Sequence, residues 1–592
     1  MDQILPRFSR NSLVAGLLLT AGIFSANPAL AAPAGEGRVK FAKASPNSAY
    51  GEYLVGKYAV SRGDTMVAAE SLISAAKADP LNESLREKAF IAALLSGDID
   101  YAVSSRPTNS ESPRYIQALG DLAVAVDYIK ANKPAKAGEA LDEMLALQSQ
   151  NRTGALLRPW VYALDSKWDQ ALSGAPQSRD RLLSLFGALD QAVLSEIRGK
   201  TDEAEALYKE LYQPGAVGVF FGPSYGAFLE RRGRKDEALK IYQDIAAISP
   251  DVLTEQSIIR IQSGSSDKPP LPSLKQGIAD TLFMSATLYL TEQQVEMALT
   301  SLRLSLYLNP DQDRAKILLG QIHGKMRDFN YAQKVWAEIE PNSPFYREAR
   351  MRLAWSLNDH DQKDQAFEIL ANLSKVDPQN LDLTVQMADI LRAQSKYQSG
   401  LDLIRDRVKT YGDGDFTWQA WFMQAVLYDQ LGQWDMAESA VKKAKALAPD
   451  RPEVLNFLGY GWIERNMHVK DGMELVRKAL EADPKSGAMM DSLGWGYYRL
   501  GEYDQALDWI EQAILLEPSD PEVNEHLGDV YRALGRGDEA RYQWQRVLTL
   551  EGASEKQLAS VKQKLGDTEV KAKSTVASVD APASAKVVTP KP

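Results

Sequence analysis

Residue types that commonly carry catalysis or bind metals are few and scattered in this sequence. Its four histidines lie in four separate segments, and no two have the i, i+4 spacing of a zinc-binding helix; they are His323, His360, His468 and His526. The chain contains no cysteine, which excludes disulfides, thiol catalysis and cysteine-based zinc sites. We therefore expect each histidine to lie on a surface or a helix flank, and we expect no metal site.

Two short acidic pairs could in principle offer oxygen ligands to calcium. They are Asp98-Ile99-Asp100 and Asp413-Gly414-Asp415. Neither continues into the twelve-residue calcium loop that ends in a glutamate, so we interpret both as turns. An H-E-x-x-H motif is also absent from the sequence. We predict a protein that is not an enzyme and that uses no cofactor.

The composition narrows the class of partner. The chain has 592 residues, with 45% hydrophobic and 25% charged residues, as in ordinary soluble proteins. Its formal net charge of −11 disfavours nucleic acid as a partner, because nucleic-acid-binding proteins usually present a basic face. We therefore expect protein partners and no nucleic acid.

The first 31 residues resemble a secretory signal peptide. Arg7 and Arg10 precede a short apolar run from Leu13 to Phe24, and Ala29-Leu30-Ala31 forms an A-x-A cleavage site. We predict cleavage between Ala31 and Ala32 and a periplasmic location, with no transmembrane segment after signal removal. The alternative is an uncleaved leader that anchors the chain in the inner membrane, although the run is short for a span of about 20 residues.

The elements that would position any functional surface repeat every 34 residues. Counting from Gly487, a Leu-Gly pair stands at positions 7 and 8, Tyr at 11, Ala at 20 and 27, and Pro at 32. Units that begin at Pro521 and Trp418 return the same residue types at most of these positions. This recurrence is the tetratricopeptide repeat (TPR) signature of a helix–turn–helix unit. We predict an all-α fold, a right-handed TPR solenoid of about 11–13 repeats.

The repeat offsets have a mechanical reason. Two helices approach closely only where small residues lie, which explains Gly or Ala at positions 8, 20 and 27, while large residues fill the space around the contact. A stretch of Gly, Ser and three Pro within Ser263–Pro272 predicts a linker between two arrays. The predicted segments are a signal peptide (1–31), a flexible spacer (32–48), an N-terminal array (49–262), a linker (263–275), a C-terminal array (276–552), a capping helix (553–566) and a disordered tail (567–592).

The first helices of TPR units line the concave face, and on the family pattern positions 2, 5, 9, 12 and 13 point into the groove. Aromatic and arginine side chains, which dominate protein–protein hot spots, occur among the residues at these positions. Trp495 and Tyr498 could instead pack between neighbouring units, and the sequence leaves both interpretations open. The predicted partner-binding groove comprises Asn456, Tyr460, Asp491, Trp495, Tyr498, Arg499, Glu525, Asp529 and Arg532.

Part of the C-terminal array carries more than the general repeat signature. The chain reads LNFLGYGWI from Leu455, MDSLGWGYYRLG from Met490 and HLGDV from His526. Over about residues 418–552 it resembles a widespread TPR family of the proteobacterial cell envelope. One group in that family is the lipoprotein adaptor that binds and activates the periplasmic C-terminal processing protease. That adaptor is lipid-anchored through a cysteine, and this chain has none.

Two functions follow as hypotheses. The resemblance implies a non-catalytic periplasmic scaffold or adaptor that presents substrates to a C-terminal processing protease. A long groove suits such a role, since it can hold two proteins at once and raise their effective concentration. The alternative is an assembly or export factor for envelope components or polysaccharide. The sequence does not decide between them.

Overall fold

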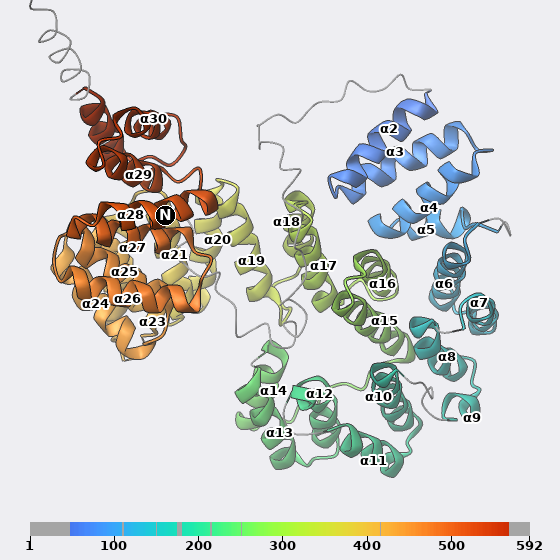
Figure 1. Ribbon diagram of the computed structural model, residues 1–592. Coiled ribbons are helices and arrows are strands. Elements are labelled where there is room, and N and C mark those ends of the chain that lie inside the picture. Colours follow the sequence, from blue (N-terminus) through green and yellow to red (C-terminus); the bar gives the residue numbers. More distant parts are fainter. Residues whose placement is uncertain are drawn as a thin grey trace, which may run out of the picture. The chain divides into compact units, whose positions relative to one another are not determined.

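The computed structural model describes residues 48–108, 112–149, 151–173, 180–212, 216–249, 251–414 and 416–566. These residues form helices joined by turns, and consecutive helices pack in pairs as TPR helix–turn–helix units (Figure 1). The predicted all-α fold of TPR repeats is confirmed. The predicted signal peptide, all of the spacer except Ser48, and the predicted tail lie outside the described residues.

The described chain divides into two compact units, here called the N-terminal unit, up to Ile369, and the C-terminal unit, from Leu370. This division differs from the predicted one at 263–275, because helices on both sides of that linker belong to the N-terminal unit. Helix α20 (Lys363–Val376) crosses the boundary. The helices of the N-terminal unit are α2 (Ala49–Ser61), α3 (Thr65–Ala78), α4 (Glu83–Ser96), α5 (Ile99–Ser104), α6 (Arg114–Lys130), α7 (Pro134–Leu147), α8 (Arg152–Leu164), α9 (Trp168–Ala171), α10 (Arg181–Arg198), α11 (Thr201–Leu211), α12 (Ala216–Arg231), α13 (Lys235–Ile248), α14 (Val252–Gln262), α15 (Leu274–Thr291), α16 (Val295–Leu308), α17 (Asp313–Lys325), α18 (Phe329–Ala337) and α19 (Tyr346–Asp359).

The C-terminal unit contains five successive helix pairs and a final helix at residues 555–566, here called the terminal helix. Side chains of Asn380, Ser486 and Asp520 cap the N-termini of three first helices by accepting backbone N–H bonds. The helices are α21 (Leu381–Ala393), α22 (Tyr397–Tyr411), α23 (Trp418–Gln430), α24 (Trp434–Leu447), α25 (Pro452–Glu464), α26 (Val469–Ala482), α27 (Gly487–Leu500), α28 (Tyr503–Leu516), α29 (Pro521–Ala533) and α30 (Gly537–Val547).

Within a pair, position 8 of the first helix touches position 24 of the second. A Cβ built on Gly494 would lie 2.5 Å from Cγ1 of Ile510, and one on Gly226 would lie 2.6 Å from the Tyr242 ring. Real side chains do not approach so closely, so glycine at position 8 permits the pair to close. This packing agrees with the predicted reason for a small residue at position 8, which is the close approach of the two helices.

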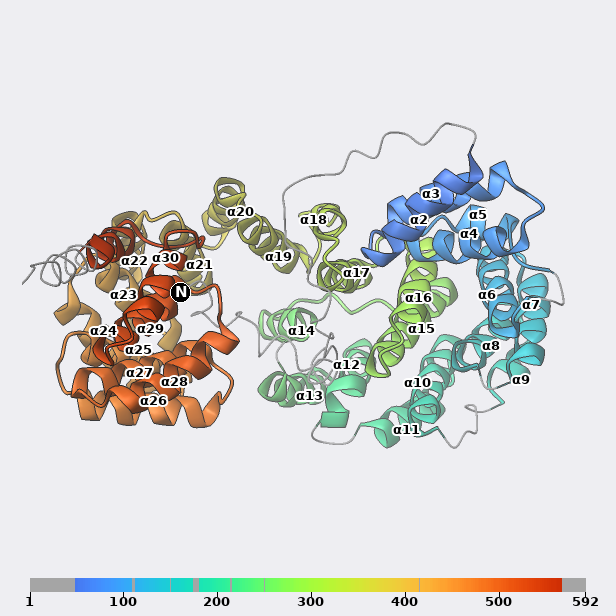
Figure 2. The same cartoon turned by 45° about the horizontal axis from the view of Figure 1, so that its top comes forward.

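The N-terminal unit bends back on itself after the segment between α14 and α15. Helices α2 to α13 form a curve, and α15 and α16 lie inside it (Figures 1 and 2). Helix α15 packs against α8, and α16 packs against α4, α5 and α6. The apolar contact is continuous, since Leu288 of α15 shares a buried cluster with Leu156 of α8 and Phe186 of α10.

Polar contacts also hold α16 against α4, α5 and α6, which lie far from it in the sequence. Arg303 of α16 donates from Nε to the carbonyl of Leu95 at 2.9 Å. The Tyr307 hydroxyl donates to Asp127 at 2.9 Å and to Asp100 at 3.0 Å. The interior of the N-terminal curve is therefore occupied by the chain's own helix pair.

Gly277 offers a direct test of this closure. A Cβ at Gly277 would overlap the ring of Trp160, which is itself buried. We expect Gly277→Ala to destabilise the N-terminal unit by roughly 1–3 kcal/mol, because α15 must move away from α8. Denaturant unfolding measures the change.

Gly138 is the matched control, since a Cβ there would meet only Cγ1 of Val161 at an ordinary 3.9 Å. It lies inside α7, so Gly138→Ala should stabilise by about 0.5–1 kcal/mol through the helix preference of alanine. Equal effects of the two substitutions on the free energy of unfolding would contradict the close packing of α15 on α8.

Candidate functional site

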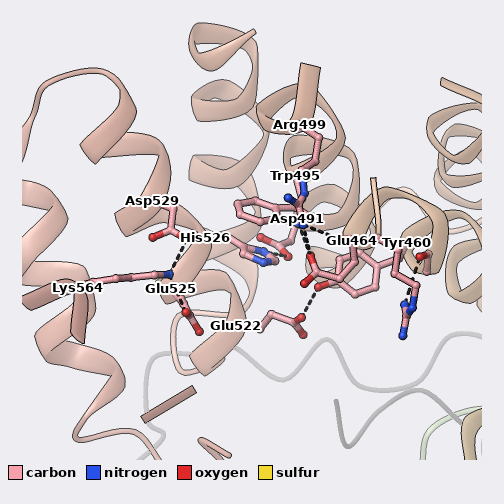
Figure 3. Close-up of polar contacts among 12 residues, drawn as sticks. Tyr460, Glu464, Asp491, Trp495, Arg499, Glu522, Glu525, His526, Asp529 and Lys564 are labelled. Carbon is pink, nitrogen blue, oxygen red and sulfur yellow. Dashed lines mark hydrogen bonds and ion pairs between the residues drawn. The ribbon is translucent and has the colours of Figure 1, made fainter. Parts of the chain in front are cut away.

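The predicted groove residues come from the first helices α25, α27 and α29 of three successive pairs. Figure 3 shows several of these side chains converging with others from the same helices and from the terminal helix. The polar atoms of most of them meet partners inside the protein.

A buried ion pair joins α27 to α29. His526 approaches Asp491 with Nδ1 2.8 Å from Oδ2, and both side chains are less than one-tenth exposed. The Trp495 ring stacks on His526 with centroids 3.9 Å apart, and it also stacks on Tyr498 at 4.5 Å. Burial is the largest single effect and lowers the pKa of His526, but the charge and hydrogen bond of Asp491, together with the charges of Glu522 and Asp529, raise it to about 9.

A second set of contacts joins α25 to α27 and to α29. The indole of Trp495 donates to Glu464 at 2.6 Å, and Arg499 lies 3.2 Å from the same carboxylate. Tyr460 of α25 donates its hydroxyl to Glu522 of α29. Burial raises the pKa of the Glu522 carboxyl group, and Tyr460 lowers it by hydrogen bonding to the carboxylate.

A third set joins α29 to α30 and to the terminal helix. The Lys564 ammonium lies 2.7 Å from both Glu525 and Asp529. Ser560 donates to Glu525 at 2.7 Å, and the indole of Trp544 donates to Asp529 at 3.1 Å. Burial raises the pKa of Asp529, although the Lys564 charge opposes that effect.

These contacts form a ladder in which an acid on one first helix meets a base on the next. Arg465 lies 2.6 Å from Asp429, and the pairs Glu464–Arg499, Asp491–His526 and Asp529–Lys564 continue the series. Each base follows its acid by 35 residues, or by 36 for Asp429 and Arg465. We call this series the inter-repeat ladder. It fastens successive repeats, so residues predicted to bind a partner also hold the array together.

The structure thus separates the nine predicted residues into two groups. Seven contact other side chains inside the protein; they are Tyr460, Asp491, Trp495, Tyr498, Arg499, Glu525 and Asp529. Trp495 is only 6% exposed, which is the geometry of a packing residue. Asn456 and Arg532 have no polar side-chain partner within the part of the chain that the structure describes, and Oδ1 of Asn456 is buried without a hydrogen bond. Partner binding by any of the nine stays a prediction.

Sequence reasoning missed several members of this site. His526 was expected on a surface or helix flank, and His323 likewise, yet both are buried, with His323 beside Asp328 at 3.0 Å. That expectation was wrong for these two histidines because each has an acidic partner to offset its burial. Glu464, Glu522 and Lys564 were also missed. The recurrence of an acid and a base about 35 residues apart was a usable signal.

One sequence pattern that suggests a nucleophile lies elsewhere. Gly222-Pro223-Ser224-Tyr225-Gly226 has the spacing of a G-x-S-x-G nucleophile elbow. An elbow requires a sharp strand-to-helix turn, whereas this segment lies inside helix α12. Across the described residues, no cluster of three or more His, Asp or Glu side chains could hold a metal ion. Nor does any helix described here have the length and apolar character to cross a membrane.

The Asp491–His526 pair predicts a pH-dependent stability. Because the pKa of His526 is raised above its usual value near 6.5, its contribution is complete below that pH and is lost as the pH rises through about 9. We expect the melting temperature of the C-terminal unit to fall over this window. His526→Ala should cost roughly 3–5 kcal/mol at pH 6, since it leaves the buried Asp491 charge unpaired, and should flatten the pH dependence.

His468 supplies the control, because it is exposed and lies in the same unit. Because His468 has a φ of 46°, the control substitution is His468→Asn, which tolerates this backbone and should leave both the melting temperature and its pH dependence as in the wild type. A pH profile unchanged by His526→Ala would contradict the assignment.

Comparisons with known proteins agree with this architecture. Residues 379–552 match the tetratricopeptide repeat family. The chain is 26% identical over 221 residues to the TPR repeat-containing protein PA4667 of Pseudomonas aeruginosa, a match that covers 37% of this chain and 36% of that protein. The chain therefore spans little more than a third of the length of this curated relative.

The chain also resembles solved structures, but the TM-scores of these matches are low. The Cut9–Hcn1 hetero-tetramer of the APC/C matches over 87% of this chain and 96% of that chain, with 15% identity and a TM-score of 0.38. TTC0263, a TPR protein of Thermus thermophilus, matches over 31% of this chain and 97% of that chain, with 22% identity and a TM-score of 0.27. From the repeat geometry and the family match, residues 379–552 form a tetratricopeptide repeat region.

Proposed function

We propose that this chain is a scaffold that binds protein partners on the first-helix face of its C-terminal unit. TPR arrays present such faces to proteins, and the charged and aromatic residues of α25, α27 and α29 suit protein recognition. The half-buried Asn456 and Arg532 are the predicted groove residues left without an internal polar partner in the described chain. They are our first candidates for contact with a partner.

The observation that carries this proposal is the self-occupied interior of the N-terminal unit. Helices α15 and α16 fill the curve of α2 to α13 and contact α4, α6 and α8 (Figure 2). A partner would have to displace the buried contacts of Leu288 and Gly277 to enter there. The corresponding face of the C-terminal unit is lined by its own first helices and ends at the short terminal helix.

We further propose a periplasmic location and a role in presenting substrates to a C-terminal processing protease. The leader at residues 1–31 and the resemblance over about residues 418–552 support this finer role. A scaffold that holds an enzyme and its substrate together raises their effective concentration without any chemistry of its own. No catalytic group is required of this chain.

Affinity capture from an envelope fraction tests the proposal, with bound proteins identified by mass spectrometry. Three baits are compared: the wild type, the double variant Asn456→Ala/Arg532→Glu, and Lys478→Glu as an exposed charge reversal on the second helix α26. We expect the wild type and Lys478→Glu to recover a processing protease and the double variant to lose most of it, since one reversed charge at an interface commonly costs tenfold or more in affinity.

Melting temperatures equal to the wild type show that the variants are folded. Recovery of export or assembly components in place of a protease would contradict the adaptor role while keeping the scaffold. Equal recovery by all three baits would contradict the proposed surface.

A further inference from the structure

The terminal helix occupies the place that the first helix of another repeat would take. Ser560 donates to Glu525 across 35 residues, the same interval that separates His526 from Asp491 one repeat earlier. Lys564 then meets Asp529 across another 35 residues and continues the inter-repeat ladder. The array thus ends by docking a helix on α29, and a lysine makes its closing contact (Figure 3).

This helix is held by few buried contacts. All its residues at 555–566 are described, and Val561 alone among them is buried. Helix α29, by contrast, buries seven residues. Val561 joins an apolar cluster with Leu527, Val530 and Trp544, and Leu565 packs at its edge. The terminal helix is therefore attached mainly through Val561, the partly buried Leu565 and the contacts of Lys564 and Ser560.

The surface beneath it has a defined chemistry. Glu525 and Asp529 stand one turn apart on α29, each with a side chain 13% exposed. Two carboxylates in such surroundings need a cation close by, because burial without one is costly. The apolar cluster beside them accepts a branched side chain three residues before that cation, as Val561 stands before Lys564.

We propose that this surface, formed by Glu525, Asp529 and the apolar cluster of α29 and α30, is a docking site for a basic amphipathic helix of a partner protein. The partner helix takes the place of the terminal helix and brings a lysine to the two carboxylates. The inference rests on the proposed function, that the C-terminal unit binds proteins, and it specifies the kind of segment that is bound.

Exchange of one helix for another of the same pattern replaces each contact with an equivalent one. The resident helix has the advantage of being tethered, which for a short connection corresponds to an effective concentration in the millimolar range. A partner helix must therefore make additional contacts, or the resident helix must be weakened.

The probe is a fluorescent peptide of residues 553–566, and binding to the full chain is followed by anisotropy. Lys564→Gln removes the resident charge and should raise the affinity for the probe roughly tenfold over the wild type. Lys562→Gln is the matched control, because Lys562 is exposed on the same helix, and it should bind as the wild type does. Adding Glu525→Gln/Asp529→Asn to Lys564→Gln should abolish the gain.

A charge exchange separates docking from folding. In the variant Glu525→Lys/Asp529→Lys the resident Lys564 is repelled, and a probe carrying Lys564→Glu should bind more tightly than the original probe. Such selectivity requires a folded surface, so a merely unfolded variant cannot produce it. Equal affinity of the wild type, Lys562→Gln and Lys564→Gln for the probe, or no preference for the exchanged probe, would overturn the proposal.

Failure here is distinguishable from failure of the proposed function. The peptide assay uses purified components, so a negative result removes the helix-docking site but leaves the capture of partners by Asn456 and Arg532 unaffected. Loss of the scaffold role would show instead as equal recovery of proteins by all the capture baits.

Discussion

Repeats in both described units depend on a close approach between two helices that leaves room for glycine or alanine alone at one point. Gly494 against Ile510 and Gly226 against Tyr242 are examples from the two units. This contact sets the distance between the two helices of a pair. A single pair of helices is too thin to bury its apolar faces by itself. Stability must then come from neighbouring pairs, as in other repeat architectures. The two units of the chain meet that need in different ways.

The N-terminal unit covers its inner surface with its own helices α15 and α16, and the C-terminal unit links its first helices with the inter-repeat ladder. Asp491–His526 and Asp529–Lys564 are rungs of that ladder. A buried ion pair is a weak source of net stability, because desolvation offsets most of the attraction. These pairs instead favour one register of successive repeats, because a shifted arrangement would leave the buried Asp491 or Asp529 without a cation, which is costly. The same polarity gives the face its chemistry for a partner.

The sequence predicts local structure far better than it predicts which repeats touch. The 34-residue offsets predict the helix pairs of the C-terminal unit, such as α27 with α28 and α29 with α30. The return of α15 into the N-terminal curve was not predicted, because Gly277 and Trp160 share no repeat position that links them. The predicted groove contained ladder residues such as Asp491 and Arg499, since positions that point inward also face the next first helix. Distinguishing the two roles requires the actual distances between repeats.

In the proposed scaffold the C-terminal unit offers the binding face, while the interior of the N-terminal unit is closed by α15 and α16. Hydrogen–deuterium exchange of the full chain, with and without a captured partner, tests it most directly. We expect new protection of backbone amides on α25, α27 and α29 and unchanged exchange on α8, α15 and α16. Protection confined to α8, α15 and α16, or increased exchange there as the helix pair is displaced, would contradict it.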